Sequence, residues 1–167
     1  TFQRNKLLSL SGMYNGEMLS ASEYKSLASL DGAGFHGGYN HIVYQMVGQP
    51  LGVFYLPHST GLESDGNGGY TYGIADLNGG GVSLEDGEDR YVAGQAVPKT
   101  ILGSNISFRY KRFDLSLQIN GAFGHKIYNG TSLTYMNMNI FPDYNVMKKA
   151  PQQNIKDQTA TDYWLEK

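Results

Sequence analysis

The segment 106–124 alternates between apolar and polar side chains along nearly its whole length. The apolar positions are Ile106, Phe108 and Tyr110 before Lys111-Arg112, and Phe113, Leu115, Leu117 and Ile119 after it. Successive side chains of a strand point to opposite faces of its sheet. The segment therefore predicts a β-hairpin that turns at Lys111 and Arg112 and has one apolar and one polar face. The apolar face must contact either the core of a soluble sheet or lipid.

Strand length and flanking sequence both favour lipid. Each arm, 100–110 and 113–123, has about the 9–11 residues with which a tilted strand crosses a bilayer. Tyr110 and Phe113 flank the turn and Phe123 lies at the far end, as in the aromatic girdles of outer-membrane barrels. A core hairpin of a soluble sandwich would seldom be bordered by about 100 loop-like residues before it and about 40 after it.

A single hairpin cannot close a barrel, because the smallest barrels need about eight strands. The chain begins at Thr1 without a Met or a signal-peptide pattern and ends in "DYWLEK". We therefore expect a piece of a longer protein whose other strands complete the barrel. The predicted fold class is mainly β: part of a transmembrane β-barrel with one clear membrane hairpin, long extracellular loops and one short helix.

The chain divides into three expected regions. Residues 1–98 are a strand end followed by a long extracellular loop region, 99–124 are the transmembrane hairpin, and 125–167 are an extracellular loop leading to the next strand. Ser20 and Glu23 fit a capping box and Gly32 fits a C-terminal cap, which predicts the short helix over roughly 21–30. "YTYGI" predicts a brief strand within the Gly- and Asp-rich stretch 60–90.

Composition argues against several classes of protein. Only 17% of the 167 residues are charged and the formal net charge is -2, so no strongly basic face is expected and nucleic acid is not a predicted partner. Cysteine is absent, which removes disulfides, thiolate nucleophiles and cysteine metal sites. The 22 Gly and 13 Tyr favour turns and half-buried strands over helix bundles. The chain contains no apolar run of about 18 residues, so no transmembrane helix is predicted.

No motif in the chain predicts an enzyme. "GAGFHG" (32–37) matches the dinucleotide fingerprint, but that fingerprint needs a strand before it and a helix after it, and the expected order here is the reverse. The four histidines lack metal-ligand spacing. A G-x-S-x-G elbow and a pair of carboxylates at strong strand ends are also missing.

The stretch "DLNGGGVSLEDGEDR" (76–90) is a candidate calcium loop, and calcium is the one cofactor that the sequence suggests. Asp76, Asn78 and Gly81 fit the first, third and sixth positions of such a loop. The fifth and twelfth positions are glycines, so Asp86 or Asp89 could complete the site only in a differently shaped loop. The alternative is a Gly/Asp turn stabilised by its own Asx hydrogen bonds.

Four blocks, taken together, resemble one known family. They are "VGQPLGVFY" (47–55), "DLNGGGVSLEDGEDR" (76–90), "GQAVPKTILGSNISFRYKRFDLSLQINGAFGHKIYN" (94–129) and "DYWLEK" (162–167). In this order they resemble the late part of the SusC/RagA family of TonB-dependent outer-membrane transporters of Bacteroidetes. The block 94–129 is the most specific. Two departures matter: Gly80 stands where the family has the third acid of a D-x-N-x-D-G loop, and residues are inserted before Asp89.

The resemblance implies a large plugged barrel in the cell outer membrane. It implies import of oligosaccharides or peptides in partnership with a SusD-like surface lipoprotein, driven by TonB through parts of the protein beyond this chain. The hairpin would then be barrel wall, with the seven apolar side chains of 106–119 facing outer-membrane lipid. The segments 11–98 and 125–163 would be extracellular loops.

Aromatic residues of the last segment are the candidate contacts for ligand or lipoprotein. Tyr and Trp match both the apolar faces and the polar edges of sugar rings and peptide side chains. Tyr135, Tyr144 and Trp164 are the residues singled out. The alternative is that these side chains pack the loop against itself or against the lipoprotein. A rival function is a soluble, secreted carbohydrate-binding β-sandwich, which would bury Leu115, Leu117 and Ile119 in its own core.

Overall fold

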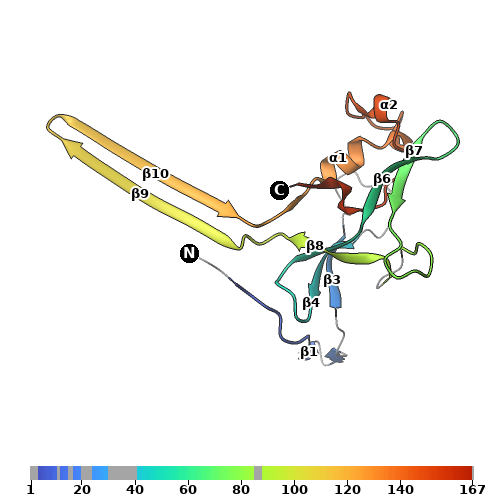
Figure 1. The fold of residues 1–167 in the computed structure, drawn as a ribbon, viewed down its shortest axis with the longest axis horizontal. Coiled ribbons are helices and arrows are strands. Elements are labelled where there is room, and N and C mark those ends of the chain that lie inside the picture. The colour runs from blue at the N-terminus through green and yellow to red at the C-terminus, as the bar shows by residue number, and fades with distance from the viewer. Residues whose placement is uncertain are drawn as a thin grey trace.

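A computed structural model describes residues 4–10, 12–14, 17–19, 24–29, 41–84 and 88–166; for residues 12–29 and His41 it describes the backbone alone. The described chain is mainly β, with small sheets and short helices. Figure 1 shows a body of short strands and helices from which one long hairpin extends. No closed barrel forms among the described residues. None of the described helices has the length and apolar character needed to cross a membrane.

The central sheet of the body has four antiparallel strands in the order β3-β4-β5-β8. These strands are β3 (Tyr24–Ser29), β4 (His41–Met46), β5 (Val53–Pro57) and β8 (Arg90–Gln95). Every residue of β5 is buried. A strand buried on both faces is expected where other segments cover both sides of a sheet. The sheet is therefore the scaffold onto which the rest of the body packs.

The helix predicted over roughly 21–30 is wrong. Tyr24–Ser29 is the strand β3, which pairs with β4 from Tyr24 opposite Met46 to Ser29 opposite His41; residues 21–23 and 30 lie outside the described chain. Capping signals are local and contribute about 1 kcal/mol. Pairing with a neighbouring strand satisfies the backbone groups of the whole segment, and such tertiary context overrides local propensity.

Small sheets and short helices surround this scaffold. They are β1 (Gly12–Tyr14) with β2 (Glu17–Leu19), β6 (Ser59–Ser64) with β7 (Tyr70–Ile74), β11 (Ile127–Tyr128) with β12 (Leu165–Glu166), the helices α1 (Gly130–Tyr135) and α2 (Ala150–Gln153), and the 3-10 turns η1 (Met138–Ile140) and η2 (Asp162–Trp164). The strand predicted at "YTYGI" is β7. The described helices thus lie in the last segment of the chain, for which the sequence predicts a loop.

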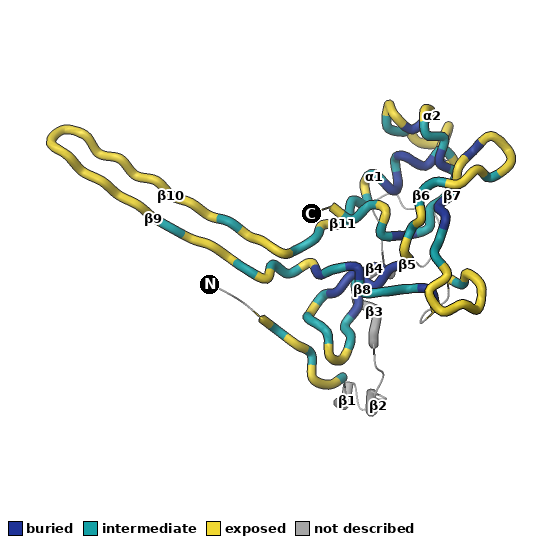
Figure 2. Tube along the Cα trace, in the orientation of Figure 1, coloured by how far each residue is buried: buried dark blue, intermediate teal, exposed yellow. Residues whose placement is uncertain are grey.

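The core joins the central sheet to that last segment. Phe54 and Leu56 of β5 and Tyr72 of β7 form one cluster with Leu133 of α1 and Ile155, which follows α2. The dark segments of Figure 2 mark this buried region in the body, whereas the hairpin is exposed along almost its whole length. Residues 125–166 are therefore folded onto the sheet by apolar contacts.

The hairpin consists of β9 (Thr100–Tyr110) and β10 (Phe113–Phe123), joined at Lys111 and Arg112. It is a two-stranded sheet, and neither outer edge pairs with another described strand. Lys111 has a φ of 52°, in the left-handed region that such two-residue turns require. The turn and the strand lengths of the sequence-based prediction are confirmed.

Candidate functional site

The register of the hairpin gathers its apolar side chains on one face. Tyr110 lies opposite Phe113, Phe108 opposite Leu115, and Ile106 opposite Leu117. Directly opposed residues of an antiparallel pair point to the same side of the sheet. Ile119, opposite Ser104, continues the row toward the body. All seven predicted lipid-facing residues are brought together, with exposed fractions from 40% at Ile119 to 77% at Phe113.

The other face of the hairpin is polar. Ser107 opposes Ser116 and Asn105 opposes Gln118. Near the turn, Arg109 and Asp114 form an exposed ion pair across the two strands. Such exposed pairs contribute little to stability, so this ion pair is not what holds the hairpin in its extended position. The hairpin is therefore two-faced, and neither face packs on the described body.

The loop between β7 and β8 uses its acidic side chains to hold its own backbone. Asp76 accepts hydrogen bonds from the backbone N–H groups of Asn78, Gly79 and Gly81, at 2.6 to 3.2 Å. The side-chain oxygen of Asn78 accepts from Gly80 N–H at 2.8 Å. The Asx turns of the alternative are thus present, and the side-chain oxygens of Asp76 and Asn78 hold the backbone of the loop itself.

Asp89 closes this loop. Its carboxylate, which no solvent reaches, accepts from the N–H groups of Ser83 at 2.8 Å and Leu77 at 2.7 Å. These two hydrogen bonds, the Ser83 bond first, lower the pKa of Asp89, and desolvation opposes them as the smaller effect. Asp86 lies outside the described residues. In the described chain, no group of three or more His, Asp and Glu side chains is placed to hold a metal.

Of the three predicted aromatic contacts, Trp164 is tied into the body. Its Nε1–H donates to the hydroxyl of Tyr72 at 2.8 Å, and its side chain packs against the apolar core. Tyr163 stacks edge-on against it with ring centroids 4.8 Å apart. Tyr135, at the end of α1, is half-buried. For Trp164 this arrangement favours the packing alternative.

Tyr144 lies at the surface and lines a pocket of about 460 Å³. Asp143, Asn139 and Gln158 line the same pocket, as does the buried Ile140. An exposed ring beside carboxylate and amide groups offers the mixed apolar and polar surface that suits a sugar or a peptide side chain. Among the three predicted contacts, Tyr144 has the setting that a ligand would need.

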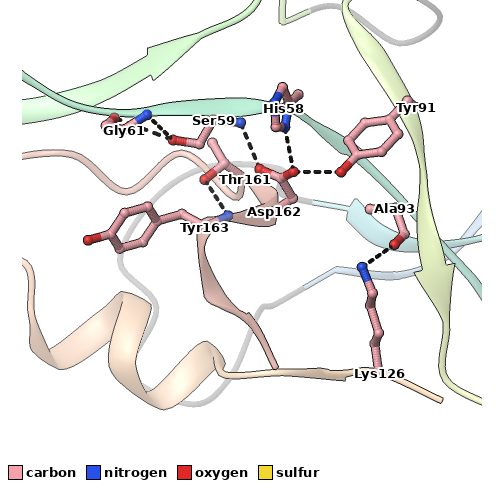
Figure 3. A network of polar contacts seen from close by, with 9 residues as sticks. All are labelled: His58, Ser59, Gly61, Tyr91, Ala93, Lys126, Thr161, Asp162 and Tyr163. Atoms are coloured by element: carbon pink, nitrogen blue, oxygen red, sulfur yellow. Dashed lines mark hydrogen bonds and ion pairs between the residues drawn. The ribbon is translucent and has the colours of Figure 1, made fainter. Parts of the chain in front are cut away.

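Sequence reasoning missed a polar network around Asp162, which Figure 3 shows. Its Oδ2 accepts from the Tyr91 hydroxyl at 2.6 Å and lies 2.7 Å from Nδ1 of His58, and its Oδ1 accepts from Ser59 N–H at 2.7 Å. Desolvation, followed by the hydrogen bond to Asp162, raises the pKa of Tyr91 to about 12. The network fastens the last segment of the chain to β6 and β8. No local spacing could have revealed it, because its members lie far apart along the chain.

Comparison of the sequence with the known protein families and with curated proteins finds no match. The family resemblance of the four blocks therefore stays a prediction.

Proposed function

We propose that this chain is part of an outer-membrane nutrient importer, with β9 and β10 in the membrane wall and the body at the extracellular surface. The importer takes up glycans or peptides together with a SusD-like lipoprotein, and TonB supplies the energy. The observation that carries the proposal is the exposed, two-faced hairpin. The resemblance of 94–129 to the SusC/RagA transporters supplies the class of transporter.

The dimensions of the hairpin suit a membrane. Eleven residues per strand, at a rise of about 3.3 Å each, extend for about 36 Å, or about 26 Å along the membrane normal at a tilt of 45°. This matches the apolar band of outer-membrane barrels, which is about 25 Å tall. Tyr110 and Phe113 at one end and Phe123 at the other stand where interfacial aromatic girdles are expected.

The unpaired edges of the hairpin support the same proposal. An isolated two-stranded hairpin is at best marginally stable in water. Strands on either side of β9 and β10 would pair their bare edges, and lipid would cover the apolar face. The rival β-sandwich would bury Leu115, Leu117 and Ile119 in its own core, whereas their exposed fractions are 62%, 48% and 40%. The exposed fractions therefore favour the membrane proposal.

Single-cysteine labelling tests the proposal directly: these 167 residues contain no cysteine, and any cysteine elsewhere in the intact protein is first replaced by serine. We expect Leu117→Cys, in the protein expressed in its membrane, to react with a lipid-soluble maleimide and to resist a charged one. Gln118→Cys, one residue along and on the opposite face, is the matched control. It should react with the charged reagent through the barrel lumen.

The labelling pattern discriminates between the two functions. If Leu117→Cys and Gln118→Cys react equally with the charged reagent, the hairpin is not a membrane wall. If Leu117→Cys resists both reagents in a protein that remains in solution, the apolar face is buried in a core, as the β-sandwich requires.

A further inference from the structure

Basic side chains gather where the hairpin joins the body. Lys99 directly precedes β9, and its N–H donates to the carbonyl of Phe123, the last residue of β10, at 2.9 Å. Arg4 and Lys6 of the first described segment line the same pocket as Lys99, which has a volume of about 420 Å³. The remaining lining residues of this pocket are uncharged, although the chain as a whole is slightly acidic. The pocket therefore has a positive charge that nothing in its lining balances.

A larger pocket adjoins the first and shares Lys99 with it. It has a volume of about 790 Å³ and also lacks acidic lining residues. Phe123, which ends the apolar face of the hairpin, lines this second pocket together with Lys126. The basic cluster is thus continuous with the apolar surface for which lipid is proposed.

The segment that carries Arg4 and Lys6 is held in place by the turn between β4 and β5. Leu7 N–H donates to Gln49 O at 2.9 Å, and Gly48 N–H donates to Leu7 O at 2.8 Å. Asn5 adds a side-chain bond, because its Oδ1 accepts from Leu51 N–H at 2.9 Å. The backbone around the two cations is therefore fixed, and the first pocket is part of the fold.

The cations of the first pocket have no partner within the described chain. Arg4, Lys6 and Lys99 are exposed, and their side chains form no hydrogen bond or ion pair with any described residue. By contrast, Nζ of Lys126 donates to the carbonyl of Ala93 at 2.6 Å. Three unpaired cations in one pocket are suited to an anion with several acceptor oxygens, and a phosphate group has that chemistry.

We propose that Arg4, Lys6 and Lys99 bind the phosphate of an anionic lipid headgroup at the outer boundary of the membrane. The inference rests on the proposed function, because it places β9 and β10 in the membrane. Lipid chains would lie along the apolar face that Phe123 ends, and the headgroup phosphate would reach the pocket beside it. Basic pockets at the membrane surface bind anionic headgroups in this way.

Vesicle flotation of the full chain tests the proposal with a matched pair of variants. Lys6→Gln with Lys99→Gln removes two charges from the pocket, and Lys148→Gln with Lys149→Gln removes two exposed charges next to α2. At low salt, we expect the first pair to weaken binding to vesicles containing phosphatidylglycerol by about tenfold or more relative to the second pair. Binding to phosphatidylcholine vesicles should be the same for both, and Lys99→Arg should bind as the natural chain does.

The other outcomes each overturn the proposal. Equal losses for the two pairs would show a general charge effect without a site. If inorganic phosphate shifts the amide resonance of Lys99 while the vesicles do not discriminate between the pairs, the pocket binds free phosphate and the lipid assignment is wrong. Leu117→Arg reports on the proposed function separately: if it leaves binding to phosphatidylcholine vesicles unchanged, the membrane hairpin fails whatever the lysines show.

Discussion

Leu117 of β10 lies directly opposite Ile106 of β9, and about half of each side chain is exposed. Gln118 and Asn105, one position along, form the corresponding pair on the other face. The hairpin therefore presents two chemically different surfaces that are separated by the thickness of one sheet. This contrast between adjacent positions makes the environment of each face measurable.

If β10 lies in the membrane as proposed, Leu117→Arg should cost about 2–4 kcal/mol of folding free energy, because its position near the middle of the strand would place a charge near the bilayer midplane. Gln118→Arg should be far milder, because its side chain lies on the opposite, polar face of the hairpin. The measurement is the denaturant midpoint of the protein in vesicles, supported by the yield of heat-resistant folded protein. Equal effects of the two changes would contradict the assignment of the faces.

Asp162→Asn should loosen the attachment of the last segment to the body. The change removes the negative charge that Tyr91, Ser59 and His58 contact. Loss of one partner from such a group typically costs about 1–3 kcal/mol. We expect a lower unfolding midpoint and faster proteolysis within residues 157–166.

Asp143→Asn is the control for Asp162→Asn, because Asp143 is exposed and its carboxylate has no hydrogen-bond partner among the described residues. If both variants unfold at the same denaturant concentration, the network around Asp162 is not what holds the last segment.

The hairpin could be predicted from the sequence because its signal is local. Alternation from Ile106 to Ile119 depends on neighbouring residues alone, and the register follows from a two-residue turn. The helix predicted near Tyr24 failed for the opposite reason. Its capping signals were real local features, but the pairing of β3 with β4 depends on a segment that starts at His41, and no local pattern reports such a partner.

The arrangement of the body could not be predicted for the same physical reason. Asp162 contacts His58 and Tyr91 across 104 and 71 positions of sequence. Trp164 reaches Tyr72 across 92 positions. In a β-rich chain such long-range contacts decide which aromatic residues are buried and which remain available to a ligand. Aromatic residue type alone therefore predicts a ligand contact at Trp164 as well as at Tyr144, although the two side chains have different surroundings.

Alkaline pH should weaken the attachment of the last segment of the chain to the body, because the Tyr91 hydroxyl donates to Asp162 in that attachment. The folded-state pKa of Tyr91 is raised to about 12 from an ordinary value of 10.0, so folding favours the protonated phenol. The stabilisation is fully present below pH 10.0 and is lost as the pH rises through about 12. Difference absorbance of tyrosinate in Tyr91→Phe against the natural chain should show one phenol missing from the late part of the titration. A missing phenol near pH 10.0 would contradict the burial of Tyr91.

The loop between β7 and β8 should respond to acid and be indifferent to calcium chelation. The pKa of Asp89 is lowered below 3.8 in the fold, so its stabilising contribution is present above that value and disappears as the pH falls through the folded pKa. The protection factors of the Leu77 and Ser83 amides, taken relative to the intrinsic exchange rate at each pH, should fall in acid, and Asp89→Asn should lower them at neutral pH. Protection that increases when calcium is added would show that the loop binds a cation after all.

If the chain belongs to the proposed importer, Tyr144→Ala should weaken capture of the ligand by the intact protein. Tyr144 is exposed at the rim of a pocket that it shares with Asp143 and Asn139. Removing the ring takes away the apolar surface on which a sugar or a peptide side chain would pack. Contacts of this kind contribute about 0.5–1.5 kcal/mol beyond burial, so we expect a loss of about twofold to twelvefold in affinity. Ligand binding to whole cells is the measurement.

Tyr135→Ala and Trp164→Phe complete this test, because they separate a ligand contact from a packing role. Trp164→Phe removes the hydrogen bond to Tyr72, so it should lower the unfolding midpoint and affect capture only as far as folding is lost. Tyr135 is half-buried at the end of α1, and its substitution should show whether the ligand surface extends beyond the pocket of Tyr144. Surface expression and association with the lipoprotein must stay normal in Tyr144→Ala for its loss of capture to count. Capture that survives Tyr144→Ala, or that disappears only together with folding, would make Tyr144 a packing residue like Trp164.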